Sequence, residues 1–264
     1  FSGDVDVVQI EGIPADDTFG IYGGDNATDN SGVYKYISIR HGGALIGEGN
    51  EINGLTLGGV GSGTVIENIE VVANVDDGIE FFGGTVNASN LLVWAQGDDA
   101  LDIDQAYSGT IDNAVVVLGA NSDHAFEIDG PEGTATGEFT LKNATIVGNA
   151  VTLNGEYADY RSSAMGRTEN IYAYGFKDSS DVELDNDGVA TNYNDGLLTF
   201  GAWEIVLPAG VSDVMDIFAN KAETVMVSGF GSTASAVTEG ANTVGATTSL
   251  LSWTYANAKA GLGF

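Results

Sequence analysis

The sequence predicts an all-β fold, a right-handed parallel β-helix (β-solenoid) with a C-terminal cap. A short acidic phrase recurs in matching register, beginning at Asp76 (Asp-Asp-Gly-Ile-Glu-Phe), at Asp98 (Asp-Asp-Ala-Leu-Asp-Ile) and at Asp123 (Asp-His-Ala-Phe-Glu-Ile). The phrases are 22 and 25 residues apart, within the period of about 20 to 50 residues that marks solenoids. Each follows a longer run rich in Val, Ile and Leu, so every repeat supplies two strands of unequal length. A β-sandwich would also have short, regularly spaced strands, but it does not account for the repeated phrase.

The predicted strands follow one another with turns between them and without a long helical pattern, which argues against a βαβ fold. The alternation within the first phrase predicts that the side chains of Ile79 and Phe81 point into the core and that of Glu80 points outward. The equivalent residues of the later phrases are expected to point the same way. Gly-Gly at 58–59 and 83–84 provides the positive φ that sharp corners need. The strands are expected over residues 33–40, 52–57, 65–72, 79–82, 86–94, 101–103, 111–118, 126–128, 139–147, 171–174, 182–184 and 197–205.

We expect residues 1–205 to form the β-helix coils, with a loop excursion over about 129–164, where Gly-Pro-Glu-Gly and a polar segment interrupt the pattern. Residues 206–264 should form the final coils and the C-terminal cap, with a short helix over 252–260. A cap is expected because the last coil of a solenoid exposes strand edges and apolar core. The Val/Ile alternation over 1–13 predicts either part of a β-helix coil or an edge strand that is available for pairing.

The composition of the 264 residues restricts the possible partners. The chain has 8 Lys plus Arg against 38 Asp plus Glu, a formal net charge of −30, which disfavours nucleic acid and anionic membranes and attracts cations. The 43% of hydrophobic residues supplies a core that disordered acidic tails lack. There is no cysteine, which excludes disulfides and thiolate metal sites.

Compartment is inferred from other features of the chain. No apolar stretch approaches the roughly 18 residues that a membrane span requires, so we expect no direct membrane insertion. The glycine-rich, lysine-poor composition is typical of secreted bacterial β-proteins and favours an extracellular or cell-surface location. Since the chain opens at Phe1 rather than Met, we expect a processed product or a fragment.

Stacked coils convert the repeated acids into columns. Glu80, Asp102 and Glu127 should lie about 4.8 Å apart, with Glu183 as a possible fourth member. Two such charges repel by about 1 kcal/mol even with the screening of bulk water, so bound Ca²⁺, shared protons or a catalytic role could offset the repulsion. The alternative is that these acids are simply solvated turn and outer-face residues.

A second acidic column is expected two residues further along the same face. It consists of Asp104, Asp129 and Asp185. Asp185 and Asp187 also have the Asp-x-Asp-Gly spacing of a calcium loop, without the terminal Glu of an EF-hand. The candidate Ca²⁺ ligands are therefore Glu80, Asp102, Asp104, Glu127, Asp129, Asp185 and Asp187.

Motifs along most of the chain resemble right-handed parallel β-helix repeat proteins that Bacteroidota secrete or display on the surface, which have the pectate-lyase-like superfold. The motifs are Ile-Arg-His-Gly-Gly (39–43), Glu-Ile-Asn-Gly-Leu-Thr-Leu-Gly-Gly-Val-Gly-Ser-Gly-Thr (51–64), Phe-Phe-Gly-Gly-Thr-Val-Asn (81–87), Gly-Asp-Asp-Ala-Leu-Asp-Ile-Asp (97–104) and Trp-Thr-Tyr-Ala (253–256). This resemblance implies a solenoid exported to the cell surface, often behind a lipoprotein anchor, with no settled activity.

A second, local resemblance is to polygalacturonase-type glycoside hydrolases, through Asp-Gly-Ile (77–79), Gly-Asp-Asp (97–99) and Asp-His-Ala (123–125). It implies that Asp77, Asp98 and Asp99 are the acid and base carboxylates and that His124 supports them. The sequence departs from the family pattern, since Asp-His-Ala replaces Gly-His-Gly and no Arg-x-Lys follows. A site so rich in acids would repel polygalacturonate, whereas a neutral glycan escapes that objection.

Other residues receive structural interpretations. His41 at a strand end suits a hydrogen-bonding role, and Trp94, Trp203, Tyr172 and Tyr174 are more typical of core aromatics than of a sugar platform. We therefore expect a non-catalytic extracellular β-helix that acts as a structural, adhesive or glycan-associated surface module. Its partner would be a polysaccharide or a neighbouring surface protein, with assembly into a homo-oligomer or fibre as a further hypothesis and a glycoside hydrolase as the alternative.

Overall fold

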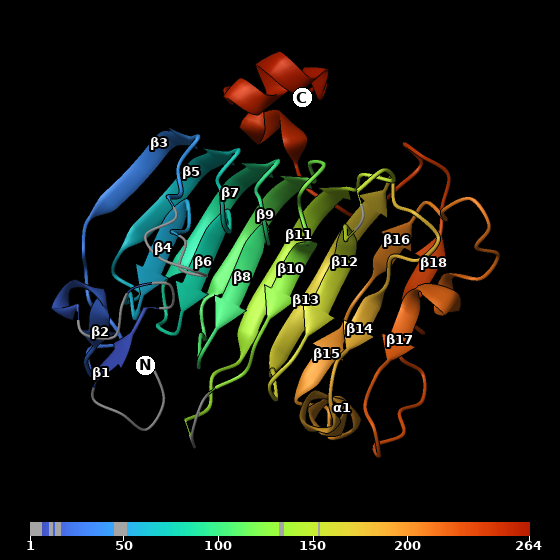
Figure 1. Cartoon of the computed structure of the whole chain (residues 1–264), viewed down its shortest axis with the longest axis horizontal. Coiled ribbons are helices and arrows are strands. Elements are labelled where there is room, and N and C mark those ends of the chain that lie inside the picture. The colour runs from blue at the N-terminus through green and yellow to red at the C-terminus, as the bar shows by residue number, and fades with distance from the viewer. Residues whose placement is uncertain (1–6, 11–12, 14–16, 45–51, 132–134, 153) are drawn as a thin grey trace.

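Two parallel β-sheets form the body of the molecule, and successive coils add a strand to each of them (Figure 1). The computed structural model describes residues 7–10, 13, 17–44, 52–131, 135–152 and 154–264. The seven-stranded sheet contains β4 (Leu55–Gly58), β6 (Ile79–Phe82), β8 (Leu101–Asp104), β10 (His124–Ile128), β12 (Glu156–Tyr160), β14 (Val182–Leu184) and β17 (Phe218–Asn220). The nine-stranded sheet contains β3 (Val33–Arg40), β5 (Val65–Val72), β7 (Asn87–Trp94), β9 (Thr110–Val117), β11 (Phe139–Val147), β13 (Gly166–Tyr174), β15 (Leu198–Phe200), β16 (Trp203–Ile205) and β18 (Ala234–Ala236). The predicted all-β parallel β-helix is confirmed.

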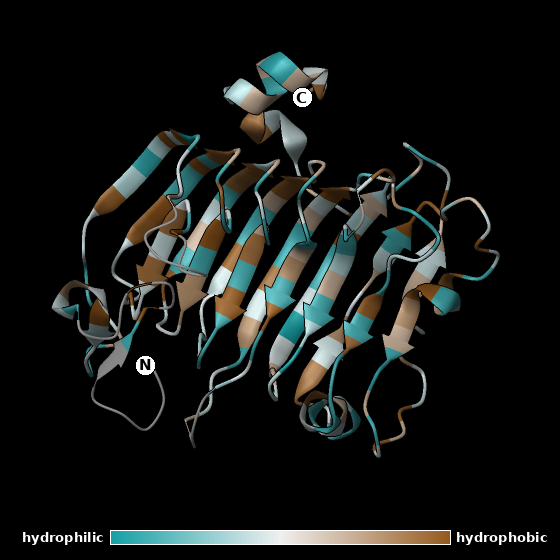
Figure 2. Cartoon of the chain, in the orientation of Figure 1, coloured by the Kyte–Doolittle hydropathy of each residue, from teal (hydrophilic) through white to brown (hydrophobic). Residues whose placement is uncertain are grey.

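The core lies between the two sheets and is built from stacked apolar side chains. Ile79 and Phe81 on β6 are fully buried, as predicted from the alternation, and so are the equivalent residues Leu101 on β8 and Phe126 on β10. Burying a side chain of this size contributes about 1.5–3 kcal/mol. Figure 2 shows the hydrophobic colouring distributed along the strands of both sheets, and every coil shares the core with its neighbours.

Each long strand is bent in its middle by one residue in the left-handed conformation. Asparagine occupies this position in five successive coils, with φ between 56° and 66°: Asn68, Asn90, Asn113, Asn143 and Asn170. Asparagine tolerates this conformation better than most residues because its short amide side chain bonds locally. The amides also bond from coil to coil, since Asn113 Nδ2 donates to Asn90 Oδ1 at 2.8 Å and Asn170 Nδ2 donates to Asn143 Oδ1 at 3.0 Å. The bend therefore recurs in register along the solenoid.

The expected loop excursion over 129–164 is wrong for most of its length. The strand predicted over 139–147 is present as β11 in the nine-stranded sheet, whereas β12, which also lies inside this range and continues the seven-stranded sheet, was not predicted. Within this range, the described residues lie outside strands in the connection between β10 and β11, in the connection between β11 and β12, and after Tyr160 at the end of β12. Turn residues occur in both connections, but Tyr157, Ala158 and Tyr160 of β12 are buried in the core and hold this strand in the sheet.

The C-terminal segment does not cap the last coil as expected. Residues 206–238 carry β17 and β18, and the chain then turns back along the outer face of the nine-stranded sheet, where its helical turns lie in Figure 1. The backbone N–H of Gly240 donates to Tyr172 Oη, and that of Ala256 donates to Glu70 Oε1 far back along the sheet. We call residues 239–264 the return segment. It lies there because this face is itself apolar: Leu251 is buried against Leu92 and Val115.

The N-terminal residues precede the first coil rather than continuing one. Of the predicted alternation over 1–13, residues 1–6, 11 and 12 lie outside the described residues. β1 (Val7–Gln9) pairs antiparallel with β2 (Ile21–Gly23) in a separate two-stranded sheet. The first coil therefore begins at β3. The one α-helix of the described residues, α1 (Asp187–Asn194), is short, and none of their helices is long and apolar enough to cross a membrane.

Candidate functional site

A column of carboxylates follows the outer face of the seven-stranded sheet. Strand register places Glu80 beside Asp102, and Asp102 beside Glu127. Asp159 then follows, and Glu183 is its neighbour on β14. The register predicted for Glu80, Asp102 and Glu127 is confirmed, and Glu183 does extend the column. Asp159 was missed because β12 was assigned to the excursion, although Tyr-Ala-Asp-Tyr carries the same alternation of core and outward residues.

These outward carboxylates are much less exposed than a sheet surface would suggest. Glu80 is 2% exposed and Asp102 is 8% exposed. The Asn53 side-chain amide donates to Glu80 Oε2. Burial, followed by repulsion from Glu80, raises the pKa of Asp102 well above its usual range. Burial and the neighbouring carboxylates therefore both favour the protonated form of Asp102.

The second predicted column is interrupted by cations. Backbone hydrogen bonds place Arg161 between Asp129 and Asp185 and place Lys221 beyond Asp185. The Arg161 guanidinium lies 2.8 Å from Asp129 and 2.7 Å from Glu127. Lys221 Nζ lies 2.7 Å from Glu183. The sequence pattern could not reveal this because it counted acids alone, whereas two of the eight basic residues lie in this column.

A third column contains three of the four residues of the hydrolase hypothesis, namely Asp77, Asp99 and His124. The Asp99 backbone N–H donates to Asp77 Oδ1 at 3.0 Å, and the His124 backbone N–H donates to Asp99 Oδ1 at 2.7 Å. The His124 ring Nδ1 also lies 2.9 Å from Asp99 Oδ1. Burial opposes the charged imidazolium, but the hydrogen bond and the charge of Asp99 outweigh burial and raise the pKa of His124 to about 10. Glu156 continues the column beside His124.

Burial is the main cause of raised pKa values across the acidic face, and repulsion between neighbours adds to it. The pKa of Glu127 rises to about 9 and that of Asp98 to about 6. The pKa values of Glu156 and Asp159 both rise to about 7. Ion-free protein at neutral pH therefore retains protons that the same groups release in the unfolded chain.

Five groups on this face bring three potential ligand atoms within 4.8 Å of one another. A Ca²⁺–O distance of about 2.4 Å separates two oxygens on one ion by up to about 4.8 Å, so this spacing suits calcium. Among the described residues, Asp102 Oδ1 and Asp159 Oδ1 are buried and have no hydrogen-bond partner. Buried acceptors without partners are costly, and a cation would satisfy them. The groups are Asp77–Glu80–Asp102, Asp76–Asp77–Asp98, Asp99–His124–Glu127, Glu156–Asp181–Glu183 and Asp159–Glu183–Asp185.

Of the seven predicted calcium ligands, four belong to these groups, namely Glu80, Asp102, Glu127 and Asp185. Asp104 and Asp129 do not, since Asp104 accepts from the Gln105 backbone and Asp129 pairs with Arg161. Asp187 is also outside the groups, because its carboxylate accepts from the backbone N–H groups of Thr224 and Val225. Its Asp-x-Asp-Gly signal marks the start of α1, where Asn186 is the N-cap.

The hydrolase residues do come together, since one carboxylate oxygen each of Asp77 and Asp98 lie within 4.8 Å of each other, with one oxygen of Asp76 beside them. Asp77 and Asp99 are buried and only Asp98 is exposed. The Asp99 carboxylate accepts a hydrogen bond from the His124 backbone N–H and also contacts the His124 ring.

The remaining sequence candidates have structural roles. His41 has φ 54° at the end of β3, and its backbone N–H donates to Val72 O. Trp203 is fully buried in the core, as expected. Trp94 packs against Tyr255 of the return segment, and Tyr172 bonds that segment through its hydroxyl. These aromatic side chains therefore do not form an open platform.

Comparison with known proteins agrees with the architecture. The comparisons with curated proteins and with solved structures gave no match. The family model described as a pectate-lyase like beta helix domain matches residues 11–257, which include both sheets and most of the return segment. The chain therefore belongs to the pectate-lyase-like β-helix domain family.

Proposed function

We propose that this chain is a non-catalytic β-helix that serves as a structural, adhesive or glycan-associated module at the cell surface and binds Ca²⁺ on its acidic face. The observation that carries the proposal is Asp102, whose Oδ1 is buried without a partner between Asp77 and Glu80. Three carboxylates at this spacing supply oxygen ligands of the kind that Ca²⁺ prefers, and water can complete a coordination shell of 6–8 oxygens.

Arg161 and Lys221 already neutralise part of the C-terminal half of the column. Arg161 lies against Glu127 and Asp129, and Lys221 lies against Glu183. In the group Asp77–Glu80–Asp102, at the other end of the column, Asp102 Oδ1 is buried and has no hydrogen-bond partner. This end of the column is therefore where we expect an ion to bind first.

This role is consistent with the proposed extracellular location, because extracellular modules bind Ca²⁺ with Kd values of about 10⁻⁴–10⁻³ M and depend on a high ambient concentration of the ion. The net charge of −30 suits a protein exposed to such an environment. The partner would be a polysaccharide or a neighbouring surface protein, which the module would bind without catalysing a reaction on it. The Bacteroidota resemblance gives the same expectation.

Thermal unfolding with Ca²⁺ and with excess chelator tests the proposal. At a free Ca²⁺ concentration of about 100 times Kd, binding stabilises the folded state by about 2.7 kcal/mol, which raises Tm by about 5–10 °C for a domain of this size. Asp102→Asn should abolish most of this rise. The matched control is Asp178→Asn, an exposed acid outside the column, which should leave it intact.

Equal Tm values with Ca²⁺ and with chelator would refute calcium binding. A rise that survives in Asp102→Asn would place the ion elsewhere. Mg²⁺ is the control for charge screening, because it prefers to keep its own water shell and octahedral geometry and should stabilise the protein less.

The alternative function is a glycoside hydrolase that acts on a neutral or weakly charged polysaccharide. It is favoured by one observation, the exposed carboxyl of Asp98, whose pKa of about 6 suits an acid catalyst beside the ionisable Asp77 and Asp99. A reducing-sugar assay on plant and algal polysaccharides tests it. Sugar release that is lost in Asp98→Asn, with unfolding unchanged, would replace the structural proposal with the enzymatic one.

Self-assembly into a homo-oligomer or fibre is a more specific version of the structural proposal. β3 is the edge of the nine-stranded sheet, and its Val33 and Tyr36 are each 65% exposed. Long apolar edges favour pairing with another chain. Sedimentation of wild type and Val33→Lys at rising concentration tests this idea, and a monomer at every concentration in both proteins would exclude a homo-oligomer or fibre.

A further inference from the structure

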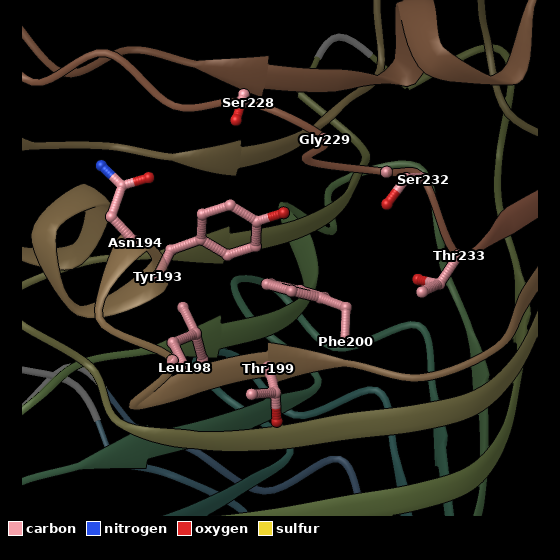
Figure 3. A pocket seen from close by; sticks show the side chains of 11 residues that line it. Tyr193, Asn194, Leu198, Thr199, Phe200, Ser228, Gly229, Ser232 and Thr233 are labelled. Carbon is pink, nitrogen blue, oxygen red and sulfur yellow. The ribbon is translucent and has the colours of Figure 1, made fainter.

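A cavity lies at the C-terminal end of the solenoid, away from the acidic face. It has a volume of about 360 Å³, is open to solvent, and is bordered by the end of α1, by β15 and by the loop that precedes β18 (Figure 3). Asn194 Nδ2 donates to Met226 O at 3.0 Å and joins the two walls. The volume is at the lower end of the range of about 300–1,000 Å³ that small-molecule sites occupy.

Aromatic rings line one wall of this cavity. Tyr193 and Phe200 both extend into it in Figure 3. Behind them, Phe230 is buried and contacts both rings edge to face, with centroids 5.4 Å from Tyr193 and 5.1 Å from Phe200. Edge-to-face contacts of this kind hold aromatic rings in fixed orientations. Phe230 therefore favours the orientation in which the two lining rings face the cavity.

Hydroxyl groups line the facing wall. Ser228, Ser232 and Thr233 are exposed, and their side chains form no hydrogen bond within the described part of the chain. The wall is shaped by glycine: Gly231 has φ 86°, and a Cβ there would lie 2.6 Å from the Phe218 ring. These hydroxyls are consequently available to a ligand.

The lining carries no ionisable group other than the Tyr193 phenol. Two other cavities of the described residues do have acidic linings, one with Asp25 and Asp29 and the other with Glu67 and Asp112. Burial raises the pKa of Tyr193, so its hydroxyl stays protonated and can donate. A ligand with a charge would gain no ion pair here, and an anionic ligand would also be repelled by the molecule as a whole.

We propose that this cavity binds a neutral saccharide of about one or two pyranose rings. The apolar face of a sugar ring would pack on Tyr193 and Phe200, and its hydroxyls would bond to Ser228, Ser232 and Thr233. Aromatic surface opposite a few polar groups is the arrangement that small-molecule sites use to combine affinity with orientation. This site is independent of the calcium proposal, because no residue of the acidic face lines it.

Isothermal titration and saturation-transfer NMR with oligosaccharides test the proposal. The probes are cellopentaose, xylopentaose, mannopentaose and maltopentaose, with pentagalacturonate as the charged comparison. We expect at least one neutral probe to bind and pentagalacturonate to bind at least about tenfold more weakly. Tyr193→Ala should weaken binding by about tenfold or more through loss of the ring surface.

A second variant keeps the test valid if Tyr193→Ala does not fold. Ser232→Ala/Thr233→Val changes only exposed side chains and should weaken binding several-fold, while the control Thr238→Val, an exposed threonine outside the cavity, should not. The absence of binding by every neutral probe at millimolar concentration overturns the proposal. Unchanged affinity in the folded variants, or preference for pentagalacturonate, also overturns it.

Discussion

Asp159→Asn tests whether the acidic face holds protons in the ion-free protein. Asp159 is 5% exposed, lies between Glu127 and Glu183 in the column, and has an Oδ1 without a partner. Burial, then repulsion from Glu183, raises its pKa from 3.8 to about 7. Asparagine has nearly the same shape and does not titrate, so it removes this proton while preserving the packing.

The sign of the effect follows from proton linkage. Between pH 4 and 7 the unfolded chain releases the Asp159 proton while the folded chain keeps it, so folding stability falls by about 1.4 kcal/mol per pH unit for this group. The loss is about 2 kcal/mol between pH 5 and 7. Glu156, with a pKa of about 7, and Glu127, with a pKa of about 9, act in the same direction. His124 adds a further loss above pH 6.5, since its folded pKa is about 10.

Urea unfolding in excess chelator measures this dependence. Wild type should lose stability as the pH rises from 5 to 7, and Asp159→Asn should gain about 2 kcal/mol relative to wild type over the same interval. The control is Asp178→Asn, whose curve should stay parallel to that of wild type. Parallel curves for Asp159→Asn, or a wild type that becomes more stable over this interval, would refute the raised pKa. Ca²⁺ should reduce the fall, because it binds the deprotonated carboxylates.

Three further predictions concern the parts that support the acidic face. Arg161→Met should destabilise the protein by about 2–3 kcal/mol because it leaves Glu127 and Asp129 without their cation, whereas Arg167→Met, which breaks an exposed pair, should cost under about 1 kcal/mol; equal costs in urea unfolding would contradict the assigned role. Asn113→Ala should be about 1–2 kcal/mol less stable than Asn113→Gly, because its φ of 66° is unfavourable for alanine; equal stabilities or the reverse order would contradict a backbone requirement at this position. Leu251→Ala should lower stability by about 2–5 kcal/mol through loss of buried contacts with the nine-stranded sheet. Unchanged unfolding together with unchanged amide exchange in the return segment would mean that it does not pack there.

The repeated phrase was sufficient to predict the β-helix and the column of Glu80, Asp102 and Glu127. Side-chain direction in a strand has a period of two, and a solenoid stacks equivalent positions, so one register assignment orders a whole column. The same reasoning failed at Asp159 because Ala158 and Tyr160 flank it in place of the large apolar residues of earlier phrases, such as Phe126 and Ile128. A core position filled by tyrosine is difficult to distinguish from a polar loop when single sequences are read.

Contacts between distant residues were decided only in the tertiary structure. The sequence alone determined the strand order, the inward and outward faces and the excess of acids, because each depends on local alternation and composition. It did not determine that Arg161 and Lys221 enter the acidic face, that outward acids such as Asp102 are buried, or that the return segment covers the long sheet instead of the last coil. These contacts join residues up to 186 positions apart in the sequence, as between Ala256 and Glu70. Their energy depends on how the side chains of the stacked coils and of the return segment pack together.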